Sequence, residues 1–293
     1  MNNIKGLLTA TQNQLYKFIS ETFMTVDLTT DYIIYKGKAD LSEPLPMLCV
    51  HLDTINTVND SEHLLKLEDI VTDGNILSLS PKSMAHCLGG DDRAGLWIAL
   101  NLIKYMESTG DFKYRIGFFT DEEIGGIGSG SFKGISDLYN TTCYIGLDRR
   151  SPNGSHEVAY YDYKNEELLG IFEDLGYSRG VGSFTDASNL SNSNIACCNL
   201  SVGYDNEHTT KEVLYLDAMN HTLEVLKELK LPSKVFVPEE VDLYSYDEYY
   251  SDGLDLIREI DRLEYENDLL RDALINAGLS PEVVLNQGGY NEI

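Results

Sequence analysis

Short apolar runs alternate with longer amphipathic segments over the first 230 residues of the chain. The runs are rich in Val, Ile, Tyr and Phe, which favour β-strands, and polar turn residues separate them. Six runs are predicted strands: 32–38, 46–54, 114–122, 143–148, 156–163 and 195–203. Because several of them are apolar at successive positions, they are typical of a sheet that is covered on both faces.

The longer segments place apolar residues three and four positions apart, which is the spacing of one face of an α-helix. Four helices are predicted on this basis: 11–22, 92–106, 166–175 and 216–229. Strands and helices in alternation indicate the α/β class. The expected architecture is a three-layer α/β/α sandwich with a mixed central sheet, formed by a domain over 1–231 and followed by a C-terminal helix.

The pattern changes after Leu231. Residues 232–252 are acidic and Tyr-rich, and we interpret them as a linker or as an arm lying on a surface. Segment 253–278 has heptad spacing, with Leu at three successive d positions and a single Asn at an a position, and 279–293 form a tail. This pattern predicts a parallel two-stranded coiled coil and hence a homodimer, although a helix packed on its own domain also fits.

The charge balance and the cysteines narrow the class of protein. The chain has 48 acidic and 22 basic residues, a net charge of −26 that would repel nucleic acid and anionic membranes. The N-terminal stretch lacks the apolar segment of a secretion signal, and no run is long enough to span a membrane. Five cysteines without CxxC spacing indicate reduced, buried thiols and a cytoplasmic protein.

His51 and Asp53 lie at the end of a predicted strand, in the sequence VHLDT. Residues two positions apart on a strand point to the same face. A metal-bound histidine usually donates its second ring N–H to a carboxylate, and Asp53 is placed to accept it. A histidine at a strand end beside an unrelated aspartate is the alternative interpretation.

Acidic residues also gather at the ends of two further elements. In LGGDDRAG, Asp91 and Asp92 precede an apolar helix, and capping of that helix explains only one of them. In TDEEIGG, Glu122 and Glu123 follow the apolar run YRIGFF. A break between strand and loop can turn both glutamates toward one cleft, although a solvated acidic loop fits the segment taken alone.

Asp148, in YIGLDRR, ends another apolar strand, and His208, in GYDNEHTTKE, follows the strand 195–203. Single residues of these types at strand ends are usually structural. Together, however, the candidate ligands all lie at expected carboxyl ends of strands or at a helix start. Open α/β sheets keep their functional sites at this edge, so the joint pattern predicts one site.

The motifs HLDT, GGDDRAG, TDEEIG, GLD and GYDNEH occur in the order found in the co-catalytic di-zinc exopeptidase superfamily, which the chain resembles over roughly residues 45–230. This superfamily includes peptidase T, carboxypeptidase G-type enzymes, acetylornithine deacetylase, succinyl-diaminopimelate desuccinylase and zinc aminopeptidases. The segment GSFTDASNL also resembles peptidase T. The resemblance implies five metal ligands: His51 and Asp148 on one metal, Glu123 and His208 on the other, and Asp91 bridging both.

The resemblance also implies that Asp53 orients His51, that Glu122 is the general base, and that the peptide bond from Asp91 to Asp92 is cis. The implied cofactors are two Zn²⁺ ions, with Co²⁺ or Mn²⁺ as substitutes, because Zn²⁺ accepts imidazole and carboxylate ligands. A metal lowers the pKa of bound water toward about 7. The base then takes the proton of that water and delivers it to the leaving amine. The base cannot also be a ligand, so two glutamates are needed.

The chain departs from many relatives in the 59 residues between Asp148 and His208, which are too few for an inserted lid domain. Arg149 and Arg150 could hold a substrate carboxylate, but we prefer a surface pair. Asp186 and Asp205 are candidates for contact with a substrate ammonium group. The remaining histidines, expected on the surface, are His63, His86, His156 and His221.

Three functions fit this sequence. The first is an aminopeptidase-like hydrolase that cleaves an amide bond of a small peptide. The second is an N-acyl amino-acid deacylase or deacetylase, whose substrate differs but whose site is the same. The third is a non-catalytic assembly or interaction protein that retains the fold, which the acidic segment and the heptads favour and the complete ligand set opposes.

Overall fold

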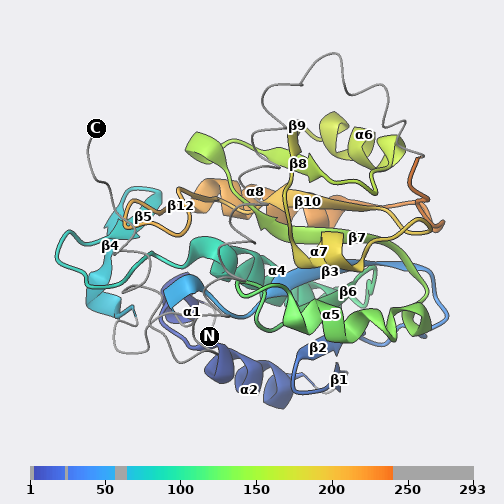
Figure 1. Cartoon of the computed structure of the whole chain (residues 1–293), viewed down its shortest axis with the longest axis horizontal. Helices are drawn as coiled ribbons and strands as arrows, with labels where there is room; N and C mark the ends of the chain where they lie inside the picture. The colour runs from blue at the N-terminus through green and yellow to red at the C-terminus, as the bar shows by residue number, and fades with distance from the viewer. Residues whose placement is uncertain (1–2, 24–25, 57–64, 240–293) are drawn as a thin grey trace, which may run out of the picture. The chain divides into compact units, whose positions relative to one another are not determined.

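The computed structural model describes residues 3–23, 26–56 and 65–239 (Figure 1). The predicted heptad helix 253–278, the tail 279–293 and most of the acidic segment 232–252 lie outside these residues, so those interpretations stay predictions. His63 is also outside them. Within the described ranges, none of the helices combines the length and the apolar composition that crossing a bilayer requires.

The main sheet is mixed and has the strand order β1-β2-β6-β3-β7-β10-β8-β9 (Figure 1). Its strands are β1 Val26–Leu28, β2 Tyr32–Tyr35, β3 Leu45–His51, β6 Arg115–Phe119, β7 Thr141–Arg149, β8 Glu157–Tyr160, β9 Ser178–Val181 and β10 Cys197–Ser201. All six predicted strands are present. The neighbours β6, β3, β7 and β10 run parallel, so their carboxyl ends meet at one edge of the sheet.

Helices cover both faces of this sheet (Figure 1). They are α1 Ile4–Leu8, α2 Gln12–Thr22, α4 Gly90–Thr109, α5 Ile127–Lys133, α6 Glu166–Asp174, α7 Asp186–Leu190 and α8 Leu216–Glu228. Alternate residues of β3 enter two separate cores: Leu48 and Val50 pack with α1, α2, α4, α6 and α8, whereas Met47 and Cys49 pack with α5 and α7. The predicted three-layer α/β/α sandwich with a mixed sheet is therefore confirmed.

Helix α4 is the longest described helix, and it is buried over most of its circumference. Its buried apolar residues include Leu96, Ile98, Leu100 and Ile103, whereas Asn101 and Lys104 on the remaining side are only partly buried. Such a wide apolar surface places most of the helix in the protein interior. It contacts β3, β7 and α8, so the acidic residues at its start lie between the ends of β3 and β7.

A second, smaller sheet was not predicted. Its order is β11-β12-β5-β4, all antiparallel, with β4 Ile70–Asp73, β5 Ile76–Leu79, β11 Tyr204–Asp205 and β12 Val213–Tyr215. These strands are short, and three of the four residues of β4 are exposed, so they lack a clear apolar pattern. The sheet matters for function because β11 and β12 flank the loop that carries His208.

The segment between Asp148 and His208 forms strands and helices of the main sandwich, namely β8, α6, β9, α7 and β10, as the sequence predicted for a chain without an inserted lid. The packed body continues past Leu231. Phe236 is 1% exposed, and its backbone N–H donates to Thr142 while its carbonyl accepts from Ala196. All five cysteines are buried and unpaired, as expected.

Candidate metal centre

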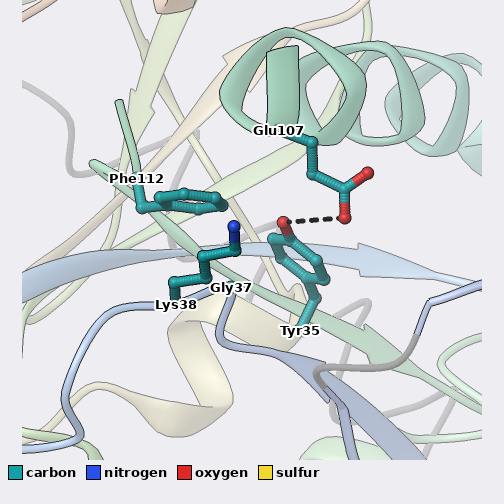
Figure 2. Close-up of a pocket in the computed structure, with 5 residues that line it drawn as sticks. All are labelled: Tyr35, Gly37, Lys38, Glu107 and Phe112. Carbon is teal, nitrogen blue, oxygen red and sulfur yellow. Dashed lines mark hydrogen bonds between the residues drawn. The ribbon is translucent and has the colours of Figure 1, made fainter. Parts of the chain in front are cut away.

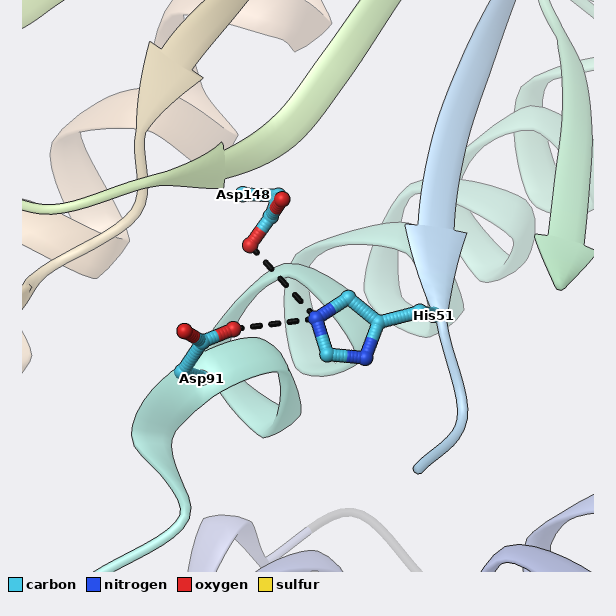
Figure 3. Close-up of side chains that lie close together, drawn as sticks. All are labelled: His51, Asp91 and Asp148. Carbon is cyan, nitrogen blue, oxygen red and sulfur yellow. Dashed lines mark hydrogen bonds and ion pairs between the residues drawn. The ribbon is translucent and has the colours of Figure 1, made fainter. Parts of the chain in front are cut away.

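The first group of metal-capable side chains consists of His51, Asp91 and Asp148 (Figure 3). His51 is the last residue of β3, Asp91 is the second residue of α4, and Asp148 lies near the end of β7. Nε2 of His51 is 2.9 Å from Oδ1 of Asp91 and 3.6 Å from Oδ1 of Asp148. The structure thus brings together three of the predicted ligands around one point.

The second group consists of Asp91, Glu123 and His208. Nε2 of His208 lies 2.9 Å from Oε2 of Glu123 and 3.3 Å from Oδ2 of Asp91. In each group the ligand atoms lie within 4.8 Å of one another. Asp91 is the residue common to both groups, with one oxygen directed to each, and this is the arrangement that a bridging carboxylate requires.

Asp53 connects the two groups through hydrogen bonds. Its Oδ1 lies 3.2 Å from Nδ1 of His51, so the ring presents its other nitrogen to Asp91. The same carboxylate accepts the backbone N–H groups of Glu122 and Glu123, each at 3.0 Å. Burial alone would raise the pKa of Asp53, but the contacts with His51 and these N–H groups hold it below its usual value. A single ionised carboxylate therefore fixes His51 and the glutamate pair relative to each other.

Glu122 belongs to neither group of ligands, although it is adjacent to Glu123. Burial raises its pKa well above the ordinary value, with His51 opposing this shift and Asp148 adding to it. A carboxyl group with a raised pKa can both accept and return a proton near neutral pH. Its surroundings therefore suit the proton-transfer role that the sequence predicted.

Asp92 has a structural role, which explains the second aspartate of GGDD. It is fully buried, and its carboxylate accepts the backbone N–H of His51 at 3.3 Å and that of Gly95 at 2.9 Å. Burial and the nearby Asp148 raise its pKa well above the ordinary value. The expected cis peptide bond between Asp91 and Asp92 is present.

Two hydroxyl groups hold the carboxylate of Asp148. Thr185 Oγ1 donates to Oδ2 at 2.9 Å, and the Tyr204 hydroxyl lies 3.1 Å from Oδ1 and 2.8 Å from the carbonyl of the same residue. Thr185 comes from the GSFTDASNL segment and caps α7. This segment therefore contributes a hydrogen bond to a predicted metal ligand.

Glu212 supports the backbone of a predicted ligand and was not predicted from the sequence. It is fully buried, and it accepts the backbone N–H of Gly89 at 2.8 Å through one carboxylate oxygen and that of Asp91 at 3.2 Å through the other. Burial raises its pKa to about 8. It fixes the backbone that delivers Asp91. One glutamate among 48 acidic residues, in a loop, carries no sequence signal for this role.

Asp186 and Asp205, the two candidates for contact with a substrate ammonium group, are engaged or buried within the protein. Asp205 accepts the backbone N–H groups of Asn153 and Asn206, so it stabilises the local loop. Asp186 is 2% exposed, and both of its carboxylate oxygens are buried. Burial raises the pKa of Asp186 to about 7. The carboxylate of Asp205 is therefore engaged by the backbone, whereas that of Asp186 has no hydrogen-bond partner among the described residues but is buried.

The glycines of TDEEIGGIGSG are needed where the chain turns beneath the site. Gly125 and Gly126 have φ values of 104° and 66°, in the region that favours glycine. At Gly128 a Cβ atom would lie 2.5 Å from the Asp31 carbonyl and from the Thr120 nitrogen. This close approach holds the start of α5 against the end of β6.

Two arginines and two histidines also have defined places. Arg149 forms an ion pair with Glu157 at 2.9 Å, and Arg150 lies 3.6 Å from Glu207, so both face glutamates.

His156 and His221 are only partly exposed, so the prediction that they are surface residues was wrong. Their rings stack with centroids 3.9 Å apart, which places the residue before β8 against a residue of α8. His86 is exposed, as predicted.

The donor chemistry fits a pair of divalent ions. Each group offers one imidazole nitrogen and two carboxylates, a set that suits Zn²⁺. Burial raises the pKa of Asp148 to about 6 and raises that of Glu123, because carboxylates gathered out of water disfavour the charged form. Bound cations would offset this crowding of negative charge.

A separate cavity of about 250 Å³ lies away from this centre (Figure 2). Its lining residues are Tyr35, Gly37, Lys38, Glu107 and Phe112. Tyr35 pairs with Ile116, near the start of β6, so the cavity is at the opposite edge of the sheet from the metal-capable groups. It contains none of the predicted site residues.

The fold of the chain is similar to that of several solved structures. No protein-family profile and no curated protein sequence matches the chain. Among solved structures, a tripeptidase from Staphylococcus aureus matches with a TM-score of 0.56 and 15% identity, covering 77% of this chain and 96% of that chain. Aminopeptidase PepT from Bacillus cereus matches with 0.56 and 13%, covering 76% and 95%.

A TET aminopeptidase from a marine sediment archaeon of the Thaumarchaeota also matches, with a TM-score of 0.54 and 12% identity over 78% of this chain and 97% of that one. At these identities the likeness concerns the fold. The chain therefore has the fold of these tripeptidase and aminopeptidase structures, which is consistent with the superfamily that its sequence motifs resemble.

Proposed function

We propose that this protein is a metal-dependent hydrolase that cleaves an amide bond of a small peptide, in the manner of an aminopeptidase. The observation that carries the proposal is a pair of three-residue ligand groups that share Asp91, with the separate carboxyl group of Glu122 beside them. The fold supports it as well, because the similar solved structures include a tripeptidase and aminopeptidases.

The assignment of ligands follows the geometry. His51 and Asp148 would hold one ion, Glu123 and His208 the other, and Asp91 would bridge the two. Two divalent ions, when bound, would polarise the carbonyl group of the substrate and lower the pKa of a bound water. Zn²⁺ is the proposed metal, and Co²⁺ or Mn²⁺ are possible substitutes.

Side chains of the protein would then transfer the proton and hold the ligands in place. Glu122 would take a proton from the attacking water on its carboxylate and deliver it to the leaving amine. Asp53 would keep His51 in one orientation, since it accepts from the ring nitrogen that faces away from Asp91. The buried Asp92 would hold the end of β3 against the start of α4.

The cellular setting is part of the proposal. Five buried, unpaired cysteines fit a reducing compartment such as the cytoplasm. The net charge of −26 argues against nucleic acid or an anionic membrane as a partner. A small peptide is the expected substrate, as for the similar peptidase structures, and a second copy of the chain is expected as a partner if the heptads of 253–278 pair.

A substrate panel tests the proposal and separates it from the alternatives. Purified protein loaded with Zn²⁺ is assayed on amino-acid amides, dipeptides, tripeptides and N-acyl amino acids, before and after removal of metal by a chelator. We expect release of N-terminal residues from di- or tripeptides, lost with the metal and restored by Zn²⁺. Hydrolysis of N-acyl amino acids alone would indicate a deacylase, and no hydrolysis by metal-loaded protein would contradict an enzymatic role.

A further inference from the structure

We propose that Gln12, the first residue of α2, is a positioning residue for Glu122 and Glu123 and acts through Asp121. The inference rests on the proposed function, since it concerns how the chain holds that site. Gln12 Nε2 donates to Oδ1 of Asp121 at 2.8 Å, and the Asp121 backbone N–H donates to Oε1 of Gln12 at 3.1 Å. Both polar atoms of one amide side chain are therefore committed to the residue that precedes the glutamate pair.

Asp121 is the point at which the chain changes direction after β6. Its φ is 58°, a conformation that residues other than glycine rarely adopt and that surrounding contacts must maintain. Its carbonyl accepts the N–H groups of Gly126 and Ile127 at 3.1 and 3.2 Å. Because Glu122 and Glu123 follow directly, the backbone geometry at Asp121 decides where their side chains point.

The glutamate pair is thus held from two sides. Asp53 accepts the N–H groups of Glu122 and Glu123, and Gln12 fixes the residue before them. These two anchors come from distant parts of the chain, one after β3 and the other on α2. The position of α2 relative to the end of β3 therefore matters for the site.

Arg93 joins these two anchors. Its fully buried guanidinium donates to the carbonyls of Leu52 and Asp53 at 2.8 and 2.9 Å, and to those of Leu7 and Ala10 at 3.2 and 3.1 Å. One side chain thus ties the α1–α2 segment to the loop that carries Asp53. Arg93 and Gln12 together attach the N-terminal segment to the two loops that carry Asp53 and the glutamate pair.

The contact of Gln12 is not needed to start α2. The N-terminus of α2 is capped by Thr11 and Gln14, since Thr11 Oγ1 accepts the Gln14 N–H at 3.2 Å and Gln14 Oε1 accepts the Thr11 N–H at 2.9 Å. The two glutamines of one helix turn therefore have different roles. Gln14 provides a matched control for a change at Gln12.

The test uses reversal of donor and acceptor. Gln12→Glu removes the donor and places a carboxylate against Asp121, whereas Asp121→Asn keeps an acceptor oxygen for Gln12. The double variant Gln12→Glu/Asp121→Asn restores the side-chain hydrogen bond with its direction reversed, while the backbone N–H of residue 121 still donates to the side chain at position 12. Gln14→Ala disturbs α2 without touching Asp121. All are made in the full chain, and each is measured for Zn²⁺ binding by calorimetric titration of metal-free protein and for tripeptide hydrolysis.

We expect Gln12→Glu to lower kcat about tenfold, with KM little changed, and to weaken binding of one of the two Zn²⁺ ions by a similar factor. The double variant should recover most of both losses, and Gln14→Ala should lower Tm while leaving kcat near wild type. A Gln12→Glu protein with unchanged kcat and Zn²⁺ affinity, or a double variant without recovery, overturns this inference alone. A wild-type chain that neither binds Zn²⁺ nor hydrolyses peptides contradicts the proposed function and the inference with it.

Discussion

Oδ1 of Asp91 lies 2.9 Å from Nε2 of His51, and this contact joins the end of β3 to the start of α4. The other oxygen of Asp91 lies 3.3 Å from Nε2 of His208, which comes from the loop between β11 and β12. One carboxylate therefore contacts histidines from opposite parts of the chain. Substitution of Asp91 should therefore affect both candidate metal sites.

Asp91→Ala should remove both ions, because it takes a ligand from each group, whereas Asp148→Ala removes a ligand from only one. Wild type should hold about two Zn²⁺ per chain. We expect about none in Asp91→Ala and about one in Asp148→Ala, the latter bound by Glu123 and His208. Metal content after gel filtration measures this. Two ions retained by Asp91→Ala would rule out the bridging role.

Glu212→Gln should destabilise the protein although it changes a single atom. Both carboxylate oxygens accept backbone N–H groups, and an amide NH₂ would face one of those donors. We expect the free energy of unfolding of the metal-free protein to fall by about 1–3 kcal/mol, measured with urea. The control Glu224→Gln changes an exposed glutamate of α8 and should have a much smaller effect. Equal effects of the two variants would contradict the role of Glu212.

The stacked pair of His156 and His221 should make stability depend on pH. Burial and the neighbouring His221 lower the pKa of His156 in the folded state below the value of about 6.5 that it has when unfolded. The unfolded chain therefore binds this proton more readily, so stability is lost as pH falls below about 6.5.

His156→Phe keeps the stacked ring and removes the proton site. The decrease in Tm between pH 7 and pH 5 should be smaller in this variant than in wild type. His86→Gln, at an exposed histidine, should keep the wild-type decrease. A His156→Phe protein whose Tm follows the wild-type pH dependence would show that His156 does not titrate as expected.

The heptads of 253–278 make a prediction from sequence alone. Leu at three d positions and Asn267 at an a position favour two parallel strands, so deletion of the residues after Asp252 should convert a dimer to a monomer. Light scattering after gel filtration gives the mass. The deletion should leave the residues of the metal centre in place, since all of them lie before that point. An unchanged mass per particle, corrected for the deleted residues, would refute the coiled coil.

Much of the fold could be predicted from the sequence, and the seven predicted site residues lie close together because of where they occur along the chain. Their roles stay predictions. His51 and Asp148 end long apolar strands, and Glu122 and Glu123 follow a third, so strand patterning also located the chemistry. Parallel neighbours then bring these ends to one edge of the sheet.

The remaining features depend on contacts that leave no local pattern. Glu212 is identified by the N–H groups it accepts, and Gln12 by its contact with Asp121, which lies 109 positions away in the chain. The small sheet was missed because β4 and β5 are short and partly exposed. His156 and His221 were assigned to the surface because sequence alone does not show that their rings, 65 positions apart in the chain, stack on each other.

In the proposed mechanism Glu122 transfers the proton, while Glu123 and the other ligands hold the metal. The most direct measurement is tripeptide hydrolysis together with Zn²⁺ content for Glu122→Gln, with the exposed Glu21→Gln on α2 as the control for loss of charge. We predict that Glu122→Gln retains about two Zn²⁺ and loses a factor of roughly 10²–10⁴ in kcat, while Glu21→Gln behaves as wild type. A Glu122→Gln protein with its metal bound and wild-type kcat would contradict the account.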